Sequence, residues 1–173
     1  MTLPAVHIPV IETERLILRG PSLDDLPASV RFGASDRSHF VGGPHQDWQV
    51  YEKIAAHIGY WAIRGYGVWT VTTRAGDIAG RIGIVHHLDW PEPELGWTVF
   101  DGFQGQGLAF EGAMAARDYA ARHFGLGPLV SNIHPDNTRS RRLAERMGAT
   151  VERETTLRNE PCLIYRHPQE TAS

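Results

Sequence analysis

The chain has 173 residues and only one cysteine, Cys162. One cysteine cannot form an internal disulfide, so the fold must rely on a hydrophobic core, and a reducing cytoplasm suits this composition. The apolar neighbours Leu163 and Ile164 predict that the thiol is buried rather than reactive.

Long apolar runs are missing as well. No stretch approaches the about 20 residues that a membrane-spanning helix requires. Residues 1–11 lack the basic segment and the cleavage site of a signal peptide, and two prolines interrupt them. We therefore expect a cytoplasmic protein that has no membrane partner.

The sequence also lacks a strong charge of one sign. It contains 17 Lys and Arg against 20 Asp and Glu, a formal net charge of -3, which excludes the dominating basic field typical of nucleic-acid binding. Nine histidines are present, but the adjacent His86 and His87 would point to opposite faces of a strand and could not easily share a metal ion. We expect neither a direct nucleic-acid partner nor a metal.

The sequence has the length and apolar content of one domain, residues 1–173, and it shows no repeat or linker. Changes between alternating and helical periodicity predict the order β-α-α-β-β-β-α-β-α-β-β. This order indicates an α/β (α+β) fold with a mixed, mostly antiparallel central sheet flanked by about four helices. The expected strands are residues 15–19, 68–73, 78–85, 94–100, 129–134, 151–156 and 162–165. The expected helices are one that begins after Ser22, then residues 49–63, 109–123 and a last one that ends at Gly148.

The most informative feature is a glycine-containing turn between the expected strand 94–100 and the expected helix 109–123. The turn consists of Gln104, Gly105, Gln106, Gly107, Leu108 and Ala109. Two glycines leave the backbone N–H groups uncovered, and the first N–H groups of a helix lack intrahelical partners and carry a partial positive charge. The turn is therefore predicted to bind a phosphate.

Two common phosphate motifs fit this turn poorly. A Walker loop requires Gly-Lys-Ser/Thr at its end, whereas Gly107 is followed by Leu108 and Ala109. A dinucleotide fingerprint requires a third small residue where this chain has Phe110, and it belongs to a parallel β-α-β unit.

Residues 104–109 fit the acyl-CoA motif Gln/Arg-x-x-Gly-x-Gly/Ala of the GNAT acyltransferase superfamily, which the chain resembles over nearly its whole length. Residues 11–19, residues 94–97 and the pair Asn137 and Ser140 also resemble the branch that includes the ribosomal-protein N-terminal (alanine/serine) acetyltransferases. The resemblance implies a GNAT-like sheet and an acetyl-CoA-dependent N-acetyltransferase, in which an amine attacks the thioester directly.

The resemblance also implies a place for each part of the co-substrate. The pyrophosphate would lie on the N–H groups of residues 106–109. The pantetheine arm would pair with the strand that carries Trp97, Thr98 and Val99, where the sheet opens beside strand 129–134. Asn137 would bind this arm, although an asparagine at this point is equally typical of a helix N-cap. Arg142 or Arg139 would contact the 3′-phosphate, although a solvated helical face explains these arginines too.

Two residues are candidates for catalysis. Glu94 is the candidate base, acting through water, and the competing interpretation is a solvated surface acid. Ser140 shares a helical face with Leu143 and Met147, and the resemblance places it near the sulfur of the cofactor. The competing interpretation of Ser140 is a core serine bonded back to its helix. Many superfamily members have a tyrosine acid where this chain has Ala144.

The acceptor is a primary amine, either a protein N-terminus or a small molecule, and the sequence does not decide between them. A catalytically silent acyl-CoA sensor or binding module is the alternative function. The sequence leaves a homodimer open, because dimers are the commonest assembly among soluble oligomers.

Overall fold

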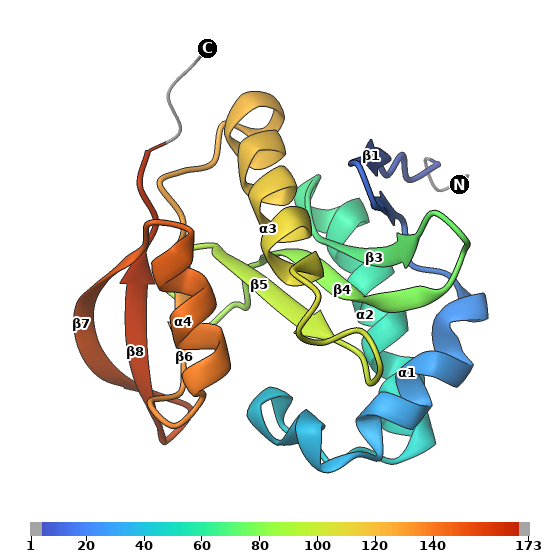
Figure 1. The fold of residues 1–173 in the computed structure, drawn as a ribbon, viewed down its shortest axis with the longest axis horizontal. Helices are drawn as coiled ribbons and strands as arrows, with labels where there is room; N and C mark the ends of the chain where they lie inside the picture. The colour runs from blue at the N-terminus through green and yellow to red at the C-terminus, as the bar shows by residue number, and fades with distance from the viewer. Residues whose placement is uncertain (1–4, 170–173) are drawn as a thin grey trace.

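The computed structural model describes residues 5–169, which form one eight-stranded sheet with helices on both of its faces (Figure 1). The strands are β1 (Ile11–Glu12), β2 (Leu16–Arg19), β3 (Val68–Thr73), β4 (Ile78–Val85), β5 (Glu94–Val99), β6 (Val130–Ile133), β7 (Thr150–Leu157) and β8 (Glu160–Arg166). The α-helices are α1 (Leu26–Gly33), α2 (Asp47–Arg64), α3 (Leu108–Tyr119) and α4 (Thr138–Arg146). The predicted order of elements is therefore confirmed.

The strands lie in the order β1-β2-β3-β4-β5-β6-β8-β7, and neighbours are antiparallel except for β5 and β6. These two parallel strands share a single pair of residues, Glu94 and Val130, at the point where both begin. Beyond that pair they separate, so the sheet has an open seam between its two halves. The mixed, mostly antiparallel sheet that the sequence predicts is confirmed.

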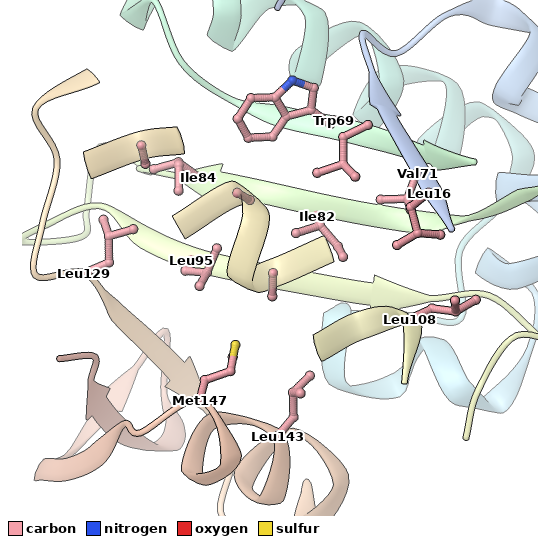
Figure 2. Packing of buried hydrophobic residues seen from close by; sticks show 14 of the residues in the cluster. Leu16, Trp69, Val71, Ile82, Ile84, Leu95, Leu108, Leu129, Leu143 and Met147 are labelled. Carbon is pink, nitrogen blue, oxygen red and sulfur yellow. The ribbon is translucent and has the colours of Figure 1, made fainter. Parts of the chain in front are cut away.

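Helices cover the two faces of the sheet unequally. Figure 1 shows α3 in front of β4 and β5, α2 behind the same part of the sheet, and α4 in front of β6 and β8. The largest core cluster lies between α3 and the sheet (Figure 2). Ala113, Ala116 and Ala120 are fully buried there, and their small side chains allow close packing of the helix on the sheet.

The structure adds short elements that periodicity does not predict. They are the edge strand β1, two 3₁₀ helices η1 (Leu23–Asp25) and η2 (Asp36–Val41), and a π-helical turn η3 (Ala120–Phe124) that continues α3. None of the helices in residues 5–169 is long and apolar enough to cross a membrane. Cys162 is buried, as predicted, and burial raises the pKa of its thiol to about 11.

Candidate active site

The glycine turn adopts the backbone conformation that its sequence predicts. Gly105 and Gly107 have φ angles of 76° and 77°, in the left-handed region where a side chain is strained, and Gly107 is the N-cap of α3. The N–H of Glu111 makes the first helical bond, to the carbonyl of Gly107 at 3.1 Å. The N–H groups of residues 108–110 therefore lie at the free helix end, where they can bind an anion.

Both glutamines of the turn brace its backbone. The N–H of Gly102 donates to Oε1 of Gln104 at 2.8 Å, and Nε2 of Gln106 donates to the carbonyl of Gly102 at 3.0 Å. The two side chains thus bind the N–H and the carbonyl of the same residue, Gly102. In this structure Gln104 and Gln106 shape the turn, and their contact with a cofactor stays a prediction.

Arg15 is a site residue that the sequence motifs did not single out. Its Nη1 donates to the carbonyl of Gln106 at 2.8 Å, and its Nε pairs with Oε2 of Glu111 at 2.6 Å. Glu111 is held further by the hydroxyl of Thr13 and by the N–H of Arg15. These bonds place a guanidinium beside the glycine turn and neutralise the acid in the first turn of α3. Nothing in the sequence spacing reveals the pair, because its members are 96 residues apart.

Side-chain bonds replace the missing strand pairing at the closed end of the seam. The N–H of Asn132 donates to Oε2 of Glu94 at 2.8 Å. The hydroxyl of Ser131 donates to the carbonyl of Leu95 at 2.6 Å. The seam therefore begins at the Glu94–Val130 pair, where two side chains satisfy backbone groups that a regular ladder would have paired.

A buried polar chain supports the serine of this seam. Nε2 of His167 lies 2.9 Å from Oγ of Ser131, and Nδ1 of His167 lies 3.2 Å from Nη1 of Arg117. Because Arg117 can only donate, His167 must accept at Nδ1 and carry its proton on Nε2. Burial and the charge of Arg117 lower the pKa of His167 to about 4, so the imidazole is neutral at physiological pH. The chain fixes the orientation of the Ser131 hydroxyl.

Glu94 lies on the face of the sheet that α2 covers. Leu95 packs in the α3 core on the other face, and side chains alternate along a strand, so Glu94 and Gly96 point away from it. Burial raises the pKa of Glu94 to about 8, although the backbone and side chain of Asn132 donate to the carboxylate and oppose this shift. A carboxyl group with a pKa near neutrality has acid–base properties that a catalytic base needs, and the role of Glu94 as the base stays a prediction.

Ser140 faces Glu94's strand from the other side of the seam. Its Oγ accepts a hydrogen bond from Nε1 of Trp97 at 3.2 Å, which spans the opening between β5 and α4. The hydroxyl proton of Ser140 remains free to donate in another direction. Asn137 is the N-cap of α4, and its side chain accepts from the N–H of Ser140 at 3.2 Å. Ala144 is fully buried and offers no acid.

These residues lie on both sides of a seam whose open end meets the glycine turn. A model of the acetyltransferase (GNAT) domain matches residues 15–150. The chain belongs to the GNAT acetyltransferase family. The resemblance that the sequence motifs carry is thereby confirmed.

Solved GNAT structures agree with this assignment. An acetyltransferase from Agrobacterium tumefaciens strain C58 is 37% identical, with a TM-score of 0.88 over 94% of this chain and 96% of that one. RimL, a ribosomal L7/L12 alpha-N-protein acetyltransferase solved with coenzyme A, has a TM-score of 0.74 at 18% identity over 92% of this chain and 96% of that one. At that identity RimL shows a shared fold alone.

Two curated relatives match shorter stretches. YkkB of Bacillus subtilis, whose function is uncharacterised, is 31% identical over 59% of this chain and 62% of its own length. The L-2,4-diaminobutyric acid acetyltransferase of Streptomyces coelicolor is 39% identical over 45% of this chain and 54% of its own length. The chain thus spans about half to two thirds of these relatives.

The remaining predicted cofactor residues of this GNAT domain border the seam. Trp97, Thr98 and Val99 are each half-buried, because β6 has diverged from β5 at this level and leaves one edge of β5 uncovered. The neighbouring strand β4, which is paired on both edges, is largely buried. Arg142 is exposed on α4, and one turn later Arg146 stacks over Phe110 with its Cζ 5.6 Å from the ring centre. This contact brings the basic face of α4 to the first turn of α3.

The site contains no obvious metal centre. Within the described part of the chain, no group of three or more His, Cys, Asp or Glu residues is arranged to hold a metal ion. The residues at the seam instead supply uncovered N–H groups, a guanidinium and half-buried strand edges, which suit an anionic, extended molecule such as acetyl-CoA.

Proposed function

We propose that this protein transfers the acetyl group of acetyl-CoA to a primary amine. The observation that carries the proposal is the open seam between β5 and β6, which has the phosphate-binding turn at its open end and Glu94 at its closed end. The strand from Glu94 to Val99 spans about 17 Å, so an extended arm that starts at the turn can reach the carboxyl group. The arm would meet the backbone of Trp97, Thr98 and Val99 and the side chain of Asn137.

The chemistry follows from the positions of two side chains. Glu94 in its ionised form takes a proton from the acceptor ammonium through a water molecule, and the free amine attacks the carbonyl carbon of the thioester. A C–N bond forms, the C–S bond breaks, and the electron pair leaves on the sulfur, which takes up the second proton that the attacking nitrogen loses. Ser140 donates its free hydroxyl proton toward that sulfur and stabilises the thiolate. The products are an N-acetyl amide and coenzyme A.

The acceptors named for the relatives belong to two chemical classes. L-2,4-Diaminobutyric acid is a small diamine that carries a carboxylate, and ribosomal L7/L12 supplies a protein N-terminus. Both are primary amines, which supports this reaction class without deciding the acceptor.

Release of coenzyme A thiol from acetyl-CoA tests the proposed function. We expect thiol release that depends on an added amine, measured across small amines, amino acids and N-terminal peptides. Clear binding of coenzyme A together with silence toward every amine would contradict the proposal and favour the alternative, an acyl-CoA sensor.

We expect Ser140→Ala to lower kcat by about tenfold without abolishing turnover. Removing the hydroxyl deletes one donor to the sulfur, but a thiolate leaves readily, so the loss is smaller than that of a general base. The matched control is Thr138→Ala, which removes an exposed hydroxyl from the first turn of the same helix. An unchanged rate in Ser140→Ala would remove Ser140 from the mechanism.

A further inference from the structure

A cluster of basic side chains lies between α2 and the sheet, on the same face as Glu94. Arg81 comes from β4, and Lys53 and His57 come from adjacent turns of α2. Ile82 and Ile84 pack in the α3 core, so alternation along β4 turns Arg81 toward α2. The three side chains are near enough for their charges to affect one another's pKa.

The guanidinium of Arg81 is half-buried, and it has no ion pair within residues 5–169. Its contact in the structure is the face of Phe100, with Cζ 5.6 Å from the ring centre. In residues 5–169 no carboxylate lies within 4.0 Å of it and no group accepts a hydrogen bond from it. Burial lowers the pKa of Arg81 to about 10, and only the charge of Asp25 opposes this shift. Asp25 is already engaged by Arg19 at 2.7 Å and by the hydroxyl of Thr70 at 2.5 Å.

Of the two α2 residues, Lys53 adds positive charge and His57 adds a neutral ring. Among residues 5–169, the hydrogen bonds of Nζ of Lys53 go only to neutral groups, the carbonyl of Val41 at 3.0 Å and Nε2 of His45 at 2.8 Å. Burial and the charge of Arg81 lower the pKa of Lys53 to about 8. Nδ1 of His57 is buried and has no hydrogen-bond partner among the described residues. Burial and the charges of Arg81 and Lys53 lower the pKa of His57 to about 3, so this ring is neutral at physiological pH. A cluster of this kind is stabilised by an anion, because an anion offsets the repulsion and satisfies the donors.

Of the residues that the structure describes, none has a side chain that covers the sheet directly over Gly96. Gly96 lies between Arg81 and Glu94 on this face, and a Cβ added to it would meet only Oε1 of Glu94 at 3.6 Å and a methyl group of Val85 at 3.8 Å. Arg81 pairs with Thr98 on β5, and Gly96 is two residues away from Thr98. Arg81 and Gly96 are therefore diagonal neighbours, about 7–8 Å apart. A molecule the size of an amino acid that lies over Gly96 therefore has the carboxyl group of Glu94 at one end and the guanidinium at the other.

We propose that Arg81, assisted by Lys53 and His57, binds a carboxylate of the acceptor, so that the acceptor is an amino-acid-like molecule carrying both an amine and a carboxylate. This inference rests on the proposed function and names the substrate class of the same site. Glu94 then faces the amine while Arg81 fixes the opposite end. A polyamine has no group for Arg81, and its second cation is repelled by the cluster.

Pairs of acceptors that differ only in the carboxylate test this inference. Suitable pairs are lysine and cadaverine, ornithine and putrescine, and alanine and ethylamine. We expect kcat/KM to favour the carboxylate member of at least one pair by about 10- to 100-fold, the effect of one charge-assisted interaction. Arg81→Gln should remove this preference, and Arg81→Lys should keep part of it.

Arg37→Gln is the matched control, because Arg37 stacks on Phe32, the ring beside Phe100, yet pairs with Asp101 at 2.8 Å. It should keep the preference of the wild type. The ratio within a pair is measured on one enzyme preparation, so a loss of stability in Arg81→Gln cancels from it.

The outcomes separate the two proposals. Equal rates for both members of every pair, a preference for the polyamines, or an unchanged ratio in Arg81→Gln overturns the carboxylate inference and leaves the proposed function intact. If peptides alone are acetylated, the acceptor is a protein N-terminus and the inference is again wrong. If no amine is acetylated at all, the proposed function fails first.

Discussion

Replacing Glu94 by glutamine is expected to lower kcat by at least about 100-fold, the usual loss when a general base is removed. Glutamine has the same shape and can still accept the hydrogen bond from the N–H of Asn132, so the end of the seam should be preserved. Only the capacity to take a proton is lost. The measurement is the steady-state rate at saturating acetyl-CoA.

The pH dependence of the rate is a second test of whether Glu94 is the base. The base acts when it is ionised, and the pKa of Glu94 is raised to about 8, so the wild-type rate should rise as pH increases through about 8. The acceptor ammonium contributes its own rise, which persists in Glu94→Gln. The difference between the two profiles isolates the carboxyl group, and identical profiles would show that Glu94 is not the base.

The substitution Glu94→Gln should raise the stability of the protein although it lowers the activity. A carboxyl pKa that is raised on folding means that the folded state holds more protons than the unfolded state between pH 4.5 and about 8, so stability falls as pH rises through that range. Glutamine carries no such penalty. Glu94→Gln should therefore melt several degrees higher than the wild type at pH 8. Glu92→Gln is the control, because Glu92 is ion-paired with Arg166 and should show neither effect.

Replacing Gly107 by valine is expected to raise the KM for acetyl-CoA by about 100-fold. The φ of 77° is unfavourable for any side chain, especially a branched one, and the new side chain would cover N–H groups at the start of α3. A Cβ at this position lies in van der Waals contact with Nη2 of Arg15, at 3.4 Å, so the branched side chain beyond it would crowd the guanidinium. The lost bonds to phosphate and the strain together account for roughly 3 kcal/mol.

Gly76→Val is the control for Gly107→Val, because it introduces backbone strain at a glycine outside the proposed cofactor site. Gly76 has a φ of 94° in the turn between β3 and β4, and an added Cβ meets nothing within 4 Å, as at an open surface. It should lower the melting temperature without changing the KM for acetyl-CoA. A KM that stays at the wild-type value in Gly107→Val would mean that the phosphates bind elsewhere.

Most of the sheet could be predicted because its signals are local. The alternation in residues 68–73 and 78–85, with Gly76 between them, gives the bounds of β3 and β4 as the structure has them. The glycine turn was also predictable, since a left-handed φ and a helix start both leave a mark in consecutive residues. Segment 36–41 was not predictable, because the 3₁₀ helix η2 has too few turns for a period to appear.

The chemistry of the site depended on contacts that sequence spacing does not encode. Glu94 could be named from a motif, but its raised pKa comes from burial by residues distant in the chain. Arg15 lies beside the glycine turn only because β2 and α3 pack together. Arg81 has no signal at all in the sequence, since an arginine in a strand is usually exposed.

The seam between β5 and β6 has a mechanical consequence. The sheet consists of two parts, one of five strands and one of three. They are joined by a single residue pair, by a few side-chain bonds, and by Leu143 of α4 and its C-cap Met147, which pack in the largest core cluster. A pantetheine arm that lies in the seam would contact both parts of the sheet. Binding of the arm would therefore stabilise the contact between the two parts of the sheet. Release of coenzyme A after each turnover would remove this stabilisation.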